Sequence, residues 1–283
     1  MAVVGGRKCY LTVFRDLNSM QPSLSVVVPT FNEQESLISV VEQLTHVPYV
    51  REIVIVDDCS TDATPVRILD LTTRYPELVR SFRHDRNLGK TAALKTGFAA
   101  TTGDIVIVQD ADLEYDPCEI QEVVKPIVEG RADVVYGSRF LVRSAARVLY
   151  YYHYVANKFL TSLSNLFTNL NMTDVETGYK AFRGDIIRNM VISSSGFGFE
   201  IEVTAKIAKL RCRVYEVPIS YYGRTYEEGK KIGTADGFYA LWCIFKYNVF
   251  VPLSGSYREL PNLAPAHVTY TRPRTSEPAA EIE

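Results

Sequence analysis

Between residues 24 and 140 the sequence alternates short runs of Val, Ile and Leu with longer segments whose apolar residues recur at helical spacing. The short runs are almost continuously apolar, which is typical of strands buried on both faces of a parallel sheet. Strands separated by helices in this way predict an α/β fold with a Rossmann-like, mainly parallel sheet and helices on both faces. The predicted strands span residues 24–33, 52–58, 79–84, 104–112 and 132–140.

Polar residues follow several of these strands at the point where each strand ends. In such sheets ligands bind outside the carboxyl ends of the strands. The polar clusters at these ends are Asn32–Glu33, Asp57–Asp58, Asp110–Asp112 and Ser138–Arg139. We therefore expect one cleft that collects all of them.

One of these clusters is strongly acidic, with Asp110, Asp112 and Glu114 on alternate positions after an apolar strand. If the chain stays extended there, the carboxylates face the same side, repel one another and raise one another's pKa. A calcium EF-hand is excluded, because Tyr115 stands at its turn glycine and Gln121 at its final glutamate. Two interpretations remain: a solvated acidic turn, or a Mg²⁺ or Mn²⁺ site completed by substrate phosphates. The second acidic pair in the same cleft favours the metal, whose charge would offset the repulsion.

Composition and short motifs exclude several classes of function. A net charge of -2 provides no basic surface for nucleic acid. The scattered cysteines, five in number and without CxxC spacing, indicate reduced thiols in a cytoplasmic protein, not a disulfide framework or a zinc site. The segment RNLGKT, residues 86–91, is not a phosphate-binding P-loop, because His84 stands where that motif needs glycine. This segment either caps the following helix or contacts a ligand.

Four regions are expected along the chain: a leader over residues 1–22, the main domain over 23–232, an amphipathic helix over 233–252 and a disordered tail over 253–283. The leader has only short apolar pieces, unlike a signal peptide. No apolar run reaches the roughly 20 residues of a membrane-spanning helix.

Two helical patterns, at 145–170 and 236–250, are rich in aromatic residues. These helices either pack in the core or at the subunit interface of a homo-oligomer, or they lie at the level of lipid headgroups as a peripheral membrane contact. The aromatic residues expected at headgroup level are Tyr150, Tyr151, Tyr152, Phe159 and Trp242.

A series of short segments occurs in one order along the chain: VVVPTFNEQESL, IVDDCSTDAT, RNLGK, QDADLEYDP, VVYGSRF, DVETGYKAF, GFGFEIEV and VPISYYGRTYEEGKKI. Together they resemble glycosyltransferase family 2, in its branch of dolichyl- and polyprenyl-phosphate mannosyl- and glucosyltransferases. Each segment alone is weak, but the ordered set is specific and extends over residues 24–248. The resemblance implies an enzyme with the nucleotide-sugar transferase fold (GT-A), whose cleft coincides with the one derived above.

The resemblance also implies a donor site for a nucleotide sugar together with Mg²⁺ or Mn²⁺. Asp110 and Asp112, on either side of Ala111, would form the DxD element that contacts ribose and the metal-bridged diphosphate, with Glu114 as a further metal ligand. The other donor-binding residues implied are Pro29, Phe31, Glu33 and Asp58 for the base and ribose, and Arg224 and Lys231 over the diphosphate. One departure from the family is Cys59, which replaces a usual glycine and is strained if the backbone there has φ > 0.

The acceptor is open between a lipid phosphate and a hydroxyl group. A phosphate monoester has a second pKa of about 6 and is largely anionic at neutral pH, so its oxygen needs no general base. The candidates for binding this phosphate are Arg139, Arg147 and His153, and arginine suits the role because its fork grips phosphate bidentately. A lipid acceptor requires peripheral membrane contact or a membrane partner protein.

A hydroxyl acceptor, in a cell-surface or soluble glycan, needs a general base, for which the candidates are Asp174, Glu176 and Glu200. The residues expected to take part directly in transfer are Asp112, Arg139, Asp174 and Glu200. The family reaction is a single displacement that converts an α-linked donor into a β-linked product. An alternative of another class, a non-catalytic nucleotide-binding scaffold, has no need for the intact Asp110, Asp112 and Arg224.

Overall fold

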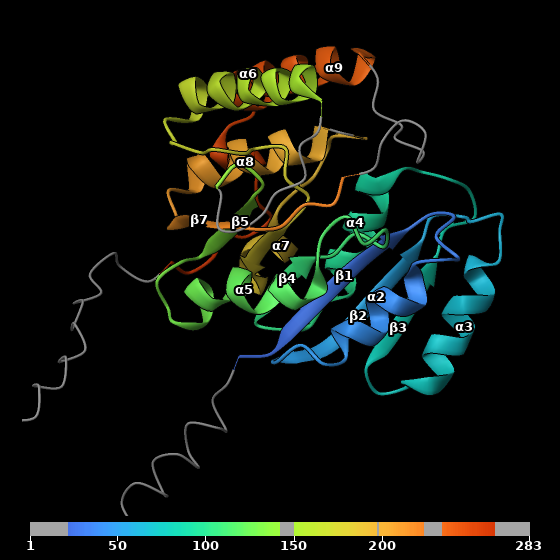
Figure 1. Cartoon of the computed structure of the whole chain (residues 1–283). Helices are drawn as coiled ribbons and strands as arrows, with labels where there is room; N and C mark the ends of the chain where they lie inside the picture. The colour runs from blue at the N-terminus through green and yellow to red at the C-terminus, as the bar shows by residue number, and fades with distance from the viewer. Residues whose placement is uncertain (1–21, 142–149, 197, 224–233, 264–283) are drawn as a thin grey trace, which may run out of the picture.

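The computed structural model of the chain describes residues 22–141, 150–196, 198–223 and 234–263. Their strands form one sheet in the order β3-β2-β1-β4-β6-β5-β7 (Figure 1). The strands are β1 (Leu24–Thr30), β2 (Val50–Asp57), β3 (Val79–Arg83), β4 (Ile105–Val108), β5 (Val134–Ser138), β6 (Lys180–Arg183) and β7 (Val214–Pro218). Only β6 runs antiparallel to its neighbours, β4 and β5. The predicted α/β fold with a mainly parallel sheet is confirmed.

Helices cover both faces of this sheet (Figure 1). One face packs against α2 (Leu37–Leu44), α3 (Thr64–Arg74) and α5 (Ile120–Val128), and the other against α4 (Lys90–Ala100), α7 (Gly184–Asn189) and α8 (Gly198–Leu210). The side chains of β1 alternate between the two cores, with Val26 and Val28 in the first and Val27 in the second. This alternation explains why the strand is apolar at successive positions.

A further helical layer lies over α8, formed by α6 (Tyr151–Thr168), α9 (Thr234–Phe245) and a π-helical turn at Lys246–Phe250 (Figure 1). Ala240 and Ile244 of α9 are buried against Ile201 and Ala205 of α8. The expected C-terminal amphipathic helix is therefore present and packs onto the main domain. No helix among the described residues has both the length and the apolar character that a membrane span requires.

The structure differs from the expected start of the disordered tail at residue 253. Leu253–Gly255 forms a 3-10 turn, and Tyr257, which is buried, pairs with Met190 in an isolated β-bridge. Leu253 and Leu263 also pack against the second core. Isolated apolar residues of this kind produce no periodic signal, so the sequence did not indicate that this segment packs. Residues 1–21 of the expected leader and 264–283 of the expected tail lie outside the described residues.

Candidate active site

The acidic segment that follows β4 is a turn and not an extended strand, so the expectation that its carboxylates share a face through strand pleating is wrong. The strand ends at Val108, and Leu113 has a left-handed backbone with φ 58°. The turn instead gathers the carboxyl groups, and the backbone N–H of Glu114 donates to the Asp112 carboxylate at 3.1 Å. Burial, together with the charges of Asp110 and Glu114, raises the pKa of Asp112 to about 7. The predicted electrostatic repulsion is present.

A lysine lies opposite this acidic turn. The Nζ atom of Lys90, the first residue of α4, lies 2.7 Å and 2.9 Å from the two carboxylate oxygens of Asp110. Burial alone would lower the pKa of Lys90, but the charges of Asp110 and then Glu200 hold it above its usual value. The segment RNLGKT therefore supplies a cation to the cleft, a role that its sequence left open.

Asp58, expected to contact the base or ribose, is buried among protein donors. The backbone N–H groups of Leu88 and Gly89 donate to its carboxylate at 2.9 Å and 2.7 Å, and His84 Nδ1 lies 2.7 Å from it. These contacts fix the turn at Gly89, where φ is 89°, and so position Lys90. Next to Asp58, Cys59 has φ 65°, which confirms the strain expected at that position.

The loop after β1 is tied to the loop after β2. The Asn32 side chain accepts from the backbone N–H of Thr61 at 2.8 Å, and the Asn32 N–H donates to Ser60 at 2.9 Å. Half-buried side chains occupy this rim of the cleft: Pro29, Phe31 and Glu33. Their assignment to the donor base and ribose stays a prediction.

Arg139 and Asp174 form a bidentate ion pair at the end of β5. Nε and Nη2 of Arg139 lie 2.7 Å and 2.8 Å from the carboxylate oxygens of Asp174, which is fully buried. Glu216 in turn accepts the backbone N–H groups of Thr173 and Asp174. The geometry thus gives Asp174 the role of orienting Arg139, and its oxygens are not free to act as a base.

A second buried cluster lies beside this pair and contains Glu176, Lys180 and Glu200. Burial, followed by the charge of Glu200, raises the pKa of Glu176 to about 8. Burial lowers the pKa of Lys180 to about 8, although the two glutamates oppose that shift. Glu176 Oε1 and Glu200 Oε2 have no hydrogen-bond partner among the described residues. Lys180 went unnoticed in the sequence because only the folded chain buries it and brings it near Glu200.

Tyr115 joins the two sides of the cleft. Its hydroxyl group accepts the backbone N–H of Gly178 at 3.0 Å, and its ring lies 5.3 Å from that of Tyr221. The guanidinium of Arg139 lies 5.2 Å from the same Tyr221 ring. The strand ends thus bring together the acidic turn and the arginine, as the sequence predicted for a shared cleft.

The other residues expected in the acceptor and donor sites are only partly covered by the structure. His153 is half-buried near the start of α6, with its ring 5.7 Å from that of Tyr150. Arg147, Arg224 and Lys231 lie outside the described residues. The roles of all four stay predictions.

The carboxylate groups of the acidic turn are chemically suited to bind a hard cation. Within the described part of the chain, no three His, Cys, Asp or Glu side chains form a ready-made metal site. Mg²⁺ and Mn²⁺ at phosphate-transfer sites, however, need only one or two protein carboxylates and take substrate phosphates as further ligands. Asp112 lies between two other carboxylates, and this surplus of negative charge favours a cation.

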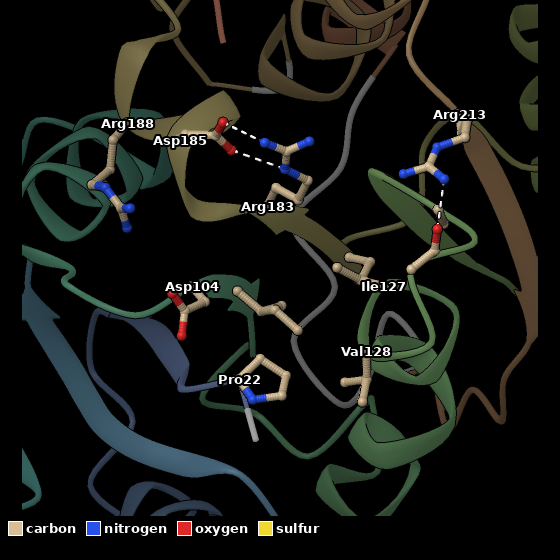
Figure 2. Close-up of a pocket in the computed structure, with 11 residues that line it drawn as sticks. Pro22, Asp104, Ile127, Val128, Arg183, Asp185, Arg188 and Arg213 are labelled. Atoms are coloured by element: carbon tan, nitrogen blue, oxygen red, sulfur yellow. Dashed lines mark hydrogen bonds and ion pairs between the residues drawn. The ribbon is translucent and has the colours of Figure 1, made fainter. Parts of the chain in front are cut away.

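A cavity of about 520 Å³ lies at the opposite, amino-terminal end of β4 (Figure 2). The arginines that line it have partners in the protein: Arg183 pairs with Asp185 at 2.6 Å, and Arg213 pairs with Asp133 at 2.9 Å. The first pair joins the end of β6 to α7, and the second joins the starts of the adjacent strands β5 and β7, so these charges stabilise the fold.

A comparison with protein families matches residues 25–191 to the model of glycosyl transferase family 2. The chain belongs to this family. It is 28% identical over 216 residues to a dolichol-phosphate mannosyltransferase of Pyrococcus furiosus, a match that covers 74% of the chain and 59% of that protein. It is also 28% identical over 215 residues to a polyprenol monophosphomannose synthase of Mycolicibacterium smegmatis, covering 74% of the chain and 81% of that protein.

Two solved structures with low sequence identity to this chain share the fold. Mannosyl-3-phosphoglycerate synthase from Rubrobacter xylanophilus aligns with a TM-score of 0.61 at 16% identity, covering 81% of this chain and 74% of that one. Glucosyl-3-phosphoglycerate synthase from Mycobacterium tuberculosis, in complex with Mn²⁺, uridine diphosphate and phosphoglyceric acid, aligns with a TM-score of 0.60 at 19% identity, covering 88% and 84%. The fold is thus GT-A, and the protein is a glycosyltransferase.

Proposed function

We propose that this glycosyltransferase moves a hexose from a nucleotide sugar to a polyprenyl-type lipid phosphate, by a single metal-dependent displacement with inversion. The observation that carries the proposal is the arrangement of charges in the cleft. The acidic turn with Lys90 lies on one side, suited to a metal and a diphosphate, and Arg139 lies on the other, held ready by Asp174. The mannosyltransferases that the chain resembles are named for dolichol-phosphate and polyprenol substrates.

The donor side would hold Mg²⁺ or Mn²⁺ through Asp112, with Asp110 and Glu114 beside it. When bound, the ion would neutralise charge that develops on the departing nucleoside diphosphate. Lys90 supplies a fixed positive charge at the same place, and its ion pair with Asp110 keeps it there before the donor binds. Arg224 and Lys231 would add to this charge.

The acceptor side suits a phosphate better than a hydroxyl group. Arginine binds phosphate oxygens through several N–H groups at once, and the pairing with Asp174 leaves Arg139 in a fixed orientation. A phosphate acceptor needs no general base, which agrees with the loss of Asp174 as a free base. A hydroxyl acceptor stays the second candidate, because Glu200 and Glu176 each keep an unpartnered oxygen that can accept a proton.

The outer helical layer has an exposed aromatic surface that fits a lipid acceptor. It includes Tyr151, Tyr152 and Phe159 on α6 and Trp242 and Phe245 on α9, and α6 contains no acidic residue. The same layer reaches Arg139, because Phe140 contacts Tyr154 of α6 edge-to-face at 5.2 Å. Aromatic residues of this kind prefer the headgroup region of a bilayer. We therefore propose peripheral membrane contact through α6 and α9, from the cytoplasmic side.

Transfer of radiolabelled sugar into an organic-extractable lipid tests the proposal. The assay offers GDP-mannose, UDP-glucose or UDP-N-acetylglucosamine with polyprenyl phosphate, with Mg²⁺ or Mn²⁺ and with EDTA. We expect lipid label from one donor, its loss with EDTA, and a fall of about 10³-fold in the Asp112→Ala variant. Metal-dependent hydrolysis of a nucleotide sugar without lipid label would contradict the acceptor and favour the hydroxyl alternative. Absence of both activities would favour the non-catalytic scaffold.

A further inference from the structure

Two glutamates in the cleft keep a carboxylate oxygen that receives no hydrogen bond from any residue that the structure describes. These atoms are Glu176 Oε1 and Glu200 Oε2, and only 6% of Glu200 is exposed to solvent. A buried acceptor without a donor is costly, so proteins keep one chiefly where a ligand completes it. Neither glutamate belongs to the acidic turn or to the arginine pair described above.

Glu202, two residues further along α8, shows that a buried glutamate in this helix can be fully satisfied. Its carboxylate accepts from the backbone N–H groups of Ser193 and Ser194 at 2.7–3.0 Å and pairs with Lys206. One carboxylate of this helix therefore has a full set of donors, and another does not. The difference marks Glu200 as a group that meets something other than protein.

The position of the two glutamates indicates what they meet. Glu200 lies in the first turn of α8, and the segment just before this helix contacts α4, since Thr91, next to Lys90, donates to the carbonyl of Gly196 at 2.8 Å. Glu176 lies in the same loop, two residues after Asp174, the partner of Arg139, and two residues before Gly178, which approaches Asp110. The glutamates thus lie between the proposed diphosphate side and the proposed acceptor side. In a single displacement the transferred sugar lies between the leaving and the attacking oxygens.

The loop that carries Glu176 is fixed against the acidic turn. A Cβ atom on Gly178 would lie 2.9 Å from Oδ2 of Asp110, so only glycine lets the loop approach so closely. The buried ammonium group of Lys180 donates to the carbonyls of Val175 and Thr177 and holds the loop from the other side. The Glu176 carboxylate therefore has a defined place in the cleft before any ligand binds.

We propose that Glu176 and Glu200 bind hydroxyl groups of the transferred hexose and so determine which sugar the enzyme accepts. A sugar hydroxyl group can both donate and accept a hydrogen bond, so it can pair with a buried carboxyl group in either protonation state. A site built to bind a hydroxyl rejects an analogue that lacks it or points it elsewhere, because its own polar group is then left unpaired. This assignment rests on the proposed function.

Calorimetric titration with Mn²⁺ present separates sugar recognition from recognition of the nucleotide. The ligands are GDP, UDP, GDP-mannose and UDP-glucose, and the variants are Glu176→Gln, Glu200→Gln and Glu200→Ala. The exposed Glu129→Gln is the matched control, and thermal melts verify folding. We expect each cleft variant to bind the nucleoside diphosphate within about twofold of the unmodified protein. Binding of the preferred nucleotide sugar should weaken tenfold or more, most strongly in Glu200→Ala.

Two results would overturn the assignment in different ways. If the cleft variants keep the ratio of nucleotide-sugar to nucleotide affinity found in the unmodified protein, the glutamates do not contact the sugar, while the proposed function stands. If the unmodified protein binds none of the ligands, the proposed function fails, and this assignment fails with it.

Discussion

The buried carboxylates at the end of β2 and those near β6 and in α8 differ in their hydrogen-bond partners. At the end of β2, Asp57 accepts from Ser60 and Arg83, and Asp58 accepts from two backbone N–H groups and contacts His84. Beside β6 and in α8, Glu176 and Glu200 each keep an oxygen without a donor. A carboxylate at a strand end is therefore not by itself a ligand site. Carboxylates with a full set of protein donors build the cleft, and those without one are available to a ligand.

The ion pair of Arg139 and Asp174 belongs to the satisfied class and should give the largest effect on stability. We expect Asp174→Ala to lower the free energy of unfolding by about 3–5 kcal/mol, because it leaves the Arg139 charge buried without its partner. Urea denaturation would measure this loss. Adding Arg139→Met should restore much of it, since both charges are then gone. If Asp174→Ala lowers the free energy of unfolding by less than about 1 kcal/mol, the ion pair does not stabilise the fold.

Asp58 should show a smaller loss, of about 1–3 kcal/mol, when it is replaced by asparagine. The amide NH₂ group cannot accept from the N–H groups of Leu88 and Gly89, so buried donors lose a partner. For a domain of this size the loss corresponds to about 2–4 °C in Tm for each kcal/mol. Asp85→Asn, on the exposed neighbouring loop, is the control. Equal melting temperatures for the two variants would contradict the structural role of Asp58.

Unlike these paired carboxylates, Glu176 should destabilise the folded protein, and the size of this effect should depend on pH. Burial raises its pKa to about 8 in the folded protein from its usual value of 4.5, so the folded state holds a proton that the unfolded chain loses between these pH values. Stability contributed by this group therefore falls as pH rises from about 4.5 to 8. The pKa of Lys180 is lowered from 10.5 to about 8, so its own effect is a rise in stability between pH 8 and 10.5.

Replacing Glu176 by glutamine removes this loss. We expect the variant to be more stable than the unmodified protein by on the order of 1 kcal/mol or more at pH 8, and by much less at pH 5. Thermal melts at a series of pH values, with Glu129→Gln as control, would measure the difference. Parallel curves for Glu176→Gln and the unmodified protein would show that the carboxyl group is not strained by burial.

The sequence predicted the sheet and the location of the cleft because both follow from local patterns. Apolar strands between helices determine a parallel sheet, and its strand ends gather the polar clusters. The antiparallel β6 was not predicted, because KAFR is only four residues long and follows a polar segment. The turn at Leu113 was missed for a related reason, since an apolar residue with φ 58° has no local signature.

The charge partners in the cleft could not be predicted, because they join residues far apart in the chain. Lys90 meets Asp110 across 20 positions, and Arg139 meets Asp174 across 35. Nothing in either local segment indicates which acid is neutralised by which base. For the same reason the sequence offered Asp174, Glu176 and Glu200 as equal candidates for a general base, whereas the structure separates them by the hydrogen-bond donors that each has.

Metal-dependent binding of a nucleoside diphosphate at Asp112 tests the central claim most directly. Calorimetry of GDP and UDP, with and without Mn²⁺, would be carried out on the unmodified protein and on Asp112→Asn. We predict that one nucleotide binds the unmodified protein, that Mn²⁺ strengthens this binding at least tenfold, and that the variant loses the metal effect while it keeps its fold. Binding that is equally strong without Mn²⁺, or that is unchanged in Asp112→Asn, would contradict the claim that the acidic turn holds the metal and the diphosphate.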